Sequence, residues 1–70
     1  MKFIDEDDNL FATCHDRRNI IKVTGERYAL LEGSAIISYD GEFIGSVCRD
    51  NILKTLVVIS EYGDFMFTIQ

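Results

Sequence analysis

The segment Tyr39-Asp40-Gly41-Glu42 constrains the fold of this chain more than any other, because it predicts a tight β-hairpin. It separates two runs of apolar and β-prone residues, Ala35–Ser38 and Phe43–Val47. Asp-Gly between such runs favours a type I′ turn, whose two central residues both need a positive φ. The chain is therefore expected to be a small β protein, a conclusion that concerns the fold and leaves the chemistry open.

A second hairpin is predicted near the N-terminus. Leu10–His15 and Ile20–Val23 are β-prone and are separated by a polar, turn-like segment. The four-residue loop between them predicts a register in which Cys14 lies opposite Ile21. Strand alternation then places two apolar side chains on the face opposite to Cys14, namely Phe11 and Ile20.

The last third of the chain predicts another hairpin, Thr55–Ser60 with Phe65–Gln70. Tyr28–Glu32 fits either a strand or a short helix, and the strand is favoured because a short isolated helix is marginal in water. Asp50–Lys54 fits a connection or one helical turn. The expected fold class is mainly β: a small antiparallel barrel or rolled sheet of five to seven short strands, with at most one short helical turn.

The length of 70 residues allows a single small domain over residues 1–70. A chain of this size buries only about 60% of its unfolded surface, so its core is thin. Residues 1–9 carry the only run of charge and are expected to form an acidic turn or a loosely ordered N-terminal segment. The sequence suggests no internal repeat, linker or low-complexity tract.

Several of the predicted strands carry apolar side chains on both faces. An antiparallel sheet with one solvent-exposed face should alternate apolar and polar residues along each strand. A strand that is apolar on both faces is expected to be buried on both faces. So short a chain has little polypeptide left to act as a cover. Either the sheet curls into a tight barrel with a lid, or a second chain covers it. The side chains expected on this protein-binding surface are Phe11, Ile20, Val57, Ile59 and Met66, and the alternative is that they belong to the interior.

The sequence contains no specific catalytic or metal-binding pattern. On a strand, His15 points away from both Cys14 and Asp16, so these neighbours do not form a nucleophile and its base. No Cys-x-x-Cys or His-x-x-x-His spacing occurs. A disulfide between Cys14 and Cys48 stays open as an alternative to two reduced thiols. We expect the chain to have no enzymatic activity, to bind no metal and to need no cofactor.

The formal net charge is −5, from 12 acidic and 7 basic residues. A negative surface repels phosphate groups, so direct nucleic-acid binding is not expected. No apolar run is long enough to span a membrane. The N-terminus lacks the apolar core of a secretory signal, and with two cysteines the expected location is the cytoplasm. The acidic surface is expected to centre on the run Asp5, Glu6, Asp7 and Asp8.

These observations favour a non-enzymatic protein–protein interaction module, of the kind seen among small viral or bacterial inhibitors and accessory factors. It would bind a partner protein through an exposed apolar sheet face or a sheet edge, and it is expected to form a homo-oligomer. The alternative is an acidic mimic of nucleic acid that occupies a basic groove of its partner.

Overall fold

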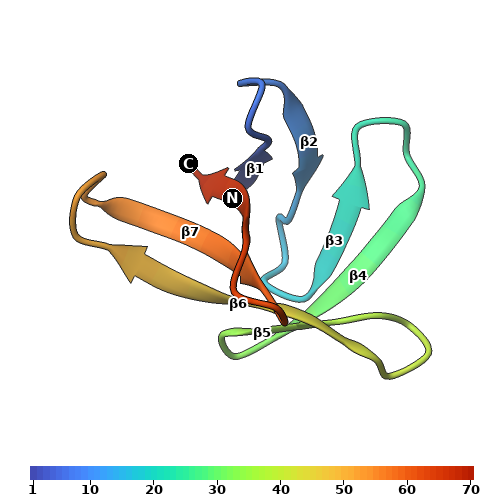
Figure 1. Ribbon diagram of the computed structural model, residues 1–70. Helices are drawn as coiled ribbons and strands as arrows, with labels where there is room; N and C mark the ends of the chain where they lie inside the picture. Colours follow the sequence, from blue (N-terminus) through green and yellow to red (C-terminus); the bar gives the residue numbers. More distant parts are fainter.

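The computed structural model describes residues 1–70 as antiparallel strands that close into a barrel in chain order, with β1 paired to β8 (Figure 1). The predicted class, a small β-barrel, is confirmed. The barrel has eight strands rather than five to seven, and it contains no helix. The strands are β1 Lys2–Ile4, β2 Leu10–Thr13, β3 Asn19–Lys22, β4 Arg27–Glu32, β5 Ala35–Ile37, β6 Phe43–Asp50, β7 Thr55–Ser60 and β8 Phe65–Ile69.

Four hairpins of the same design make up the barrel. Within each hairpin unit the third residue pairs with the twelfth. The strands that join one unit to the next also pair in the same register at every junction. The units are residues 1–14, 18–31, 34–47 and 56–69. The expectation of no internal repeat is therefore wrong. The repeat is hard to see in the sequence because only the fourth position keeps one residue type, at Ile4, Ile21, Ile37 and Ile59.

The turns within the four hairpins share one geometry. In each, the N–H of the first turn residue donates to the carbonyl of the fifth, and the N–H of the fourth donates to the carbonyl of the first. The fourth residue has a positive φ, a conformation that glycine adopts without steric cost. These fourth residues are Asp8, Gly25, Gly41 and Gly63. In the central hairpin only Gly41 has a positive φ, so the hairpin is confirmed but the predicted type I′ turn is wrong.

Each hairpin also contains one β-bulge, three residues after the positive-φ residue. In the first hairpin Phe3 pairs with Ala12 and Ile4 pairs with Leu10, which leaves Phe11 without a partner. A bulged residue interrupts the strict alternation of side chains between the two faces. All four bulged residues pack against the core: Phe11, Tyr28, Ile44 and Met66. The bulges therefore add four side chains to the interior of a very thin barrel.

The interior is built from equivalent positions of the four units. The third positions are at most 1% exposed: Phe3, Ile20, Ile36 and Val58. The twelfth positions hold three small residues and one large one: Ala12, Ala29, Gly45 and Phe67. The Phe67 ring occupies the space that the small residues leave, with ring centroids 4.9 Å from Phe11 and 6.0 Å from Phe3.

The predicted pairing of the second and third strands is corrected by one residue. Ile21 lies opposite Thr13 rather than Cys14. A slip of one residue moves every side chain of a strand to the other face. Ile20 is therefore inside the barrel, where it is 1% exposed, and not on an exposed docking face.

The N-terminal segment is also corrected. Residues 2–4 form β1, which pairs with β2 on one side and β8 on the other. Residues 5–9 form a hydrogen-bonded turn, in which Asp5 Oδ1 accepts the N–H groups of Asp7 and Asn9, each at 2.9 Å. The acidic run is thus a turn in the barrel wall rather than a loose extension. The segment Tyr28–Glu32, left open between strand and helix, is part of strand β4.

Candidate interaction surface

An apolar strip crosses the outside of the barrel from β7 over β8 and β1 to β2. Strand pairing places Ile59 beside Phe65, and Val57 and Ile4 on either side of Thr68. Ile4 also pairs with Leu10. Within this strip the side chains of Val57 and Ile4 are buried by neighbouring residues. Those of Phe65 and Leu10 are 40% and 39% exposed. The strip is defined by Ile4, Leu10, Val57, Ile59 and Phe65.

The residues expected to bind a partner do not form one surface. Ile20 lies in the interior, and Phe11 and Met66 are half-buried bulge residues packed against it. Val57 and Ile59 belong to the apolar strip, but Val57 is only 2% exposed. Ile59 is the one predicted residue that is both on the strip and partly accessible.

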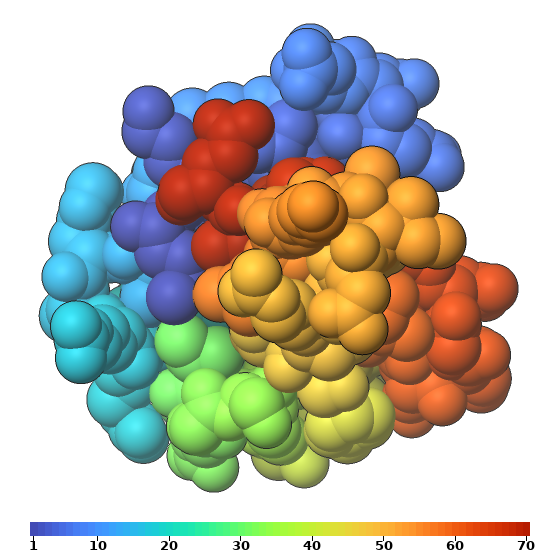
Figure 2. Space-filling model, turned by 90° about the vertical axis from the view of Figure 1, so that its left-hand side faces the viewer, coloured from blue at the N-terminus to red at the C-terminus, as the bar shows by residue number.

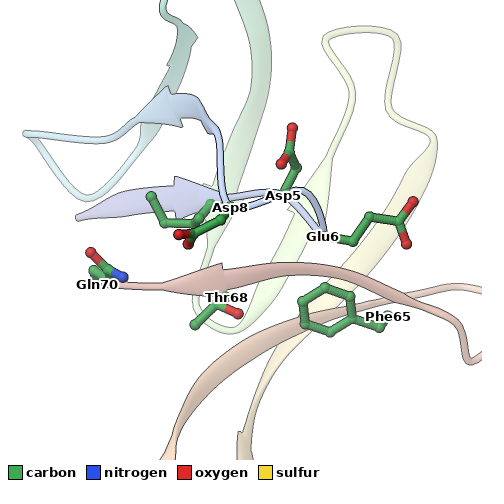
Figure 3. Close-up of a pocket in the computed structure, with 7 residues that line it drawn as sticks. Asp5, Glu6, Asp8, Phe65, Thr68 and Gln70 are labelled. Atoms are coloured by element: carbon green, nitrogen blue, oxygen red, sulfur yellow. The ribbon is translucent and has the colours of Figure 1, made fainter.

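A pocket of about 280 Å³ opens beside the apolar strip (Figure 3). The turn after β1 and strand β8 both contribute residues to it. The lining residues are Ile4, Asp5, Glu6, Asp8, Phe65, Thr68 and Gln70. Three of the four residues of the predicted acidic surface therefore line a concave site with apolar side chains in its wall; we call it the acidic pocket.

Charge is distributed unevenly along the barrel. The four turns within the hairpin units lie at one end, the turn end, and the connections between the units and both chain ends lie at the other, the loop end. Nine of the twelve acidic residues lie in the four turns, with only two of the seven basic residues at that end, Lys22 and Arg27. The loop end has three acidic and five basic residues. The turn end is thus strongly negative, and its first turn supplies the acidic residues of the acidic pocket, which extends along β8 to Gln70.

Both basic side chains at the turn end lie over aromatic rings. The Lys22 ammonium is 6.0 Å from the centre of the Phe11 ring, and the Arg27 guanidinium is 5.8 Å from that of Tyr39. Neither residue lines the acidic pocket. The carboxylates of the pocket therefore have no basic side chain of their own chain within ion-pair distance, because the one salt bridge of the protein lies elsewhere.

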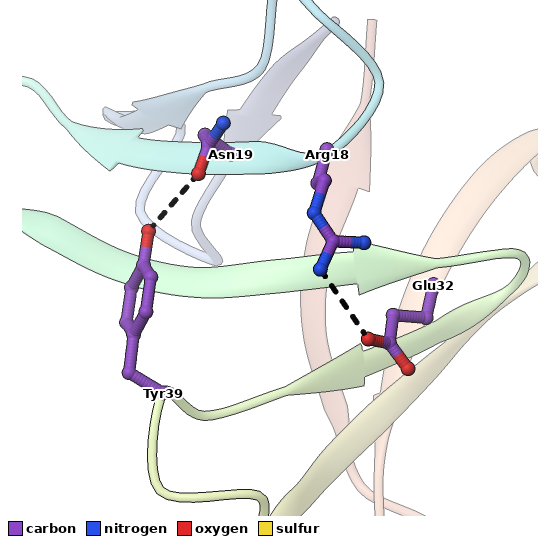
Figure 4. Close-up of polar contacts among 4 residues, drawn as sticks. All are labelled: Arg18, Asn19, Glu32 and Tyr39. Carbon is purple, nitrogen blue, oxygen red and sulfur yellow. Dashed lines mark hydrogen bonds and ion pairs between the residues drawn. The ribbon is translucent and has the colours of Figure 1, made fainter.

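The polar contacts across β3 and β4 are those of a solvated surface (Figure 4). Arg18 and Glu32 approach to 3.8 Å, but both side chains are more than half exposed. Such pairs contribute at most about 1 kcal/mol. The Tyr39 hydroxyl donates a long hydrogen bond of 3.4 Å to Asn19 Oδ1. The Arg18–Glu32 pair joins the two strands of one hairpin, and the Tyr39–Asn19 hydrogen bond joins that hairpin to the next.

Cys14, His15 and Asp16 follow β2, which ends at Thr13 rather than at His15, and Cys14 Sγ lies 4.0 Å from Asp16 Oδ1. Cys14 is buried and free, Cys48 is exposed and free, and no disulfide joins them. Asp16 instead closes the β2–β3 connection, because its Oδ1 accepts the N–H groups of Arg18 and Asn19 at 2.9 Å and 2.8 Å. No group of three or more His, Cys, Asp or Glu side chains is arranged to hold a metal ion.

The Asp16 hydrogen bonds predict a loss of stability in acid. The side-chain amide of Asn19, followed by the N–H groups of Asn19 and Arg18, lowers the pKa of Asp16 from 3.8 to about 2. A carboxylate whose pKa is lower in the folded state stabilises the fold above its unfolded pKa, and this contribution is lost as the pH falls through the folded pKa. We expect the difference in urea midpoint between the protein and Asp16→Ala to be largest above pH 4 and to shrink towards pH 2. A difference that stays constant over this range would contradict the assignment.

The fold and its surface define the class of protein: a small closed antiparallel β-barrel with one acidic end. The chain matches none of the protein-family models, curated proteins or solved structures with which it was compared. The structure has no helix long and apolar enough to cross a membrane.

Proposed function

We propose that this chain is a non-enzymatic protein-interaction module, acting as an inhibitor or accessory factor, whose turn end docks onto a basic surface of a partner protein. The observation that carries the proposal is the acidic pocket, which is lined by the acidic residues Asp5, Glu6 and Asp8 and by the apolar residues Ile4 and Phe65. Two free cysteines support a reducing compartment such as the cytoplasm.

The lining of the acidic pocket fits a lysine or arginine side chain. Both side chains have an apolar stem and a charged head, so they gain from apolar and anionic neighbours at once. The exposed Phe65 ring offers a face for a cation, and the surrounding carboxylates offer charge-assisted hydrogen bonds. The negative turn end would also speed the approach of a basic partner.

The hairpin repeat provides a matched test of this docking site. Phe65 and Phe43 occupy the same unit position, and they are 40% and 44% exposed. We expect Phe65→Ser to weaken the capture of the partner from native lysate about tenfold or more, while Phe43→Ser leaves it unchanged, because truncating an anchoring side chain costs more than about 1 kcal/mol. Capture is measured by quantitative mass spectrometry, and equal loss in both variants would contradict the proposed site.

Removal of charge gives a second matched pair within the same experiment. Glu6 lines the acidic pocket, and Glu61 occupies the same position of the fourth unit outside it. Glu6→Gln is expected to weaken capture, and Glu61→Gln is expected to have a smaller effect. The reverse order would contradict docking at the pocket.

The alternative function, mimicry of nucleic acid, is favoured by the concentration of nine acidic residues at the turn end. Mimicry predicts binding that falls steeply between low and moderate salt and that does not depend on Phe65. Docking at the pocket predicts a loss in Phe65→Ser that persists at moderate salt. The same capture at two salt concentrations distinguishes the two functions.

A further inference from the structure

One segment breaks the hairpin repeat. Three residues, 15–17, separate the first two units, and two residues, 32–33, separate the next two, whereas eight residues, 48–55, separate the last two. These eight residues extend β6 and β7 beyond the barrel wall as a paired arm (Figure 1). Figure 2 shows the arm, in gold and orange, beside the two chain ends at the loop end. The barrel can close without this arm, since the other connections are far shorter.

The tip of the arm is a built turn that displays apolar side chains. Asp50 Oδ1 accepts the N–H groups of Ile52 and Leu53 at 2.8 Å and 3.0 Å, so the expected connection there is a capped turn rather than a helical turn. Lys54 closes the turn with a φ of 56°. Ile52 is 91% exposed and Leu53 is 57% exposed, so neither contributes to the core. Exposed apolar side chains held on an ordered turn are typical of a docking element.

The chemistry of the arm complements that of the acidic pocket. Arg49 and Lys54 flank the apolar tip, and both lie at the less negative loop end. The pocket is lined by the apolar residues Ile4 and Phe65 together with the acidic residues Asp5, Glu6 and Asp8. We propose that the arm of one molecule docks into the acidic pocket of a second copy, with Lys54 among the carboxylates and the Ile52–Leu53 tip against Phe65. This inference rests on the proposed function, because it names one occupant of the same pocket.

The association is head-to-tail. The arm tip and the acidic pocket are separate parts of the surface, so a molecule that docks its arm into a second copy keeps its own pocket free, and the second copy keeps a free arm. Such a heterologous contact adds further copies unless it closes into a ring. A net charge of −5 on each copy opposes association at low ionic strength, and one arm tip covers little surface, so the contact is weak and concentration-dependent.

The test is the mass of the full chain in solution, measured by sedimentation as a function of concentration. We expect the weight-average mass to rise above the 8.0 kDa of one chain. In the double variant Ile52→Asp/Leu53→Asp, the concentration needed for this rise should increase about tenfold or more. Val23→Asp is the control, because Val23 is exposed and belongs neither to the arm nor to the lining of the acidic pocket. A wild-type chain that stays monomeric, or a rise unaffected by the arm variant, would overturn the proposal.

A mixing experiment tests the direction of docking. Phe65→Ser retains the arm, and the double arm variant retains the pocket. Each alone should stay monomeric, whereas an equimolar mixture should form a dimer and grow no further. A mixture that stays monomeric overturns head-to-tail docking, and so does arm-dependent binding of the chain to anionic lipid vesicles without self-association. If the chain does not self-associate but still captures a partner in a Phe65-dependent way, this inference is wrong and the proposed function is unaffected.

Discussion

Phe67→Ala is expected to lower the free energy of unfolding by about 3–5 kcal/mol, which is most of the stability of a barrel this small. The side chain is 7% exposed, and its ring lies 4.9 Å from Phe11, 6.0 Å from Phe3 and 6.3 Å from Tyr28. Alanine at this position would match Ala12 and Ala29 in the other units. The three remaining rings would then surround a void that no neighbouring backbone can fill.

The measurement is urea unfolding followed by far-ultraviolet circular dichroism. The midpoint should fall far below that of the wild-type chain, or the variant should be unfolded in buffer. Phe43→Ser is the control, because Phe43 is 44% exposed, belongs to no interior cluster and should change stability by less than about 0.5 kcal/mol. A midpoint for Phe67→Ala close to that of Phe43→Ser would show that the aromatic cluster does not support the barrel.

Gly45→Ala is the second large effect that we expect, at about 3 kcal/mol of destabilisation. Gly45 is buried on β6, and a Cβ atom there would collide with the backbone carbonyl of Ile59 on β7 and lie 3.2 Å from the Ser60 Cα. Backbone atoms within a paired strand cannot move aside as a flexible side chain can. The added methyl group therefore forces β6 and β7 apart at the end of their pairing that lies away from the arm, where Gly45 faces Ser60.

Gly41→Ala separates this collision from the general cost of replacing glycine. Gly41 has a φ of 91° and no atom within 4 Å of a Cβ position, so only backbone strain opposes the change. That strain costs about 1 kcal/mol. Urea midpoints measured in parallel should rank wild type above Gly41→Ala and Gly41→Ala above Gly45→Ala. Equal midpoints for the two variants would contradict the close approach of β6 and β7.

The acidic half of the candidate site could be predicted from the sequence, whereas the apolar half could not. Asp5, Glu6 and Asp8 stand out as a charge run. Phe65 reaches the pocket only because β8 pairs with β1, a contact between the two ends of the chain that no local pattern encodes. Strict alternation also assigns Phe65 to the core face, and the bulge at Met66 is what turns it outward.

The positions of the predicted docking residues also depend on contacts that the sequence does not reveal. Apolar character on both faces of the strands predicted either a closed barrel or a sheet covered by a second chain, and the structure is a closed barrel. For Ile20, Phe11 and Met66 the cover is the barrel itself, because closure and bulges bring them against the core. The sequence could not distinguish a closed barrel from a sheet covered by a partner, since both bury the same side chains.

The order of residues along this chain by itself determined the strands and their turns, because β-prone runs and positive-φ glycines act over a few neighbouring residues. Tertiary structure alone decided that eight strands close on themselves, that four bulges turn extra side chains inward, and that Phe65 meets Asp8 at one pocket. Those outcomes depend on register and on pairing between distant segments, and a shift of a single residue reverses which side of the sheet each side chain occupies.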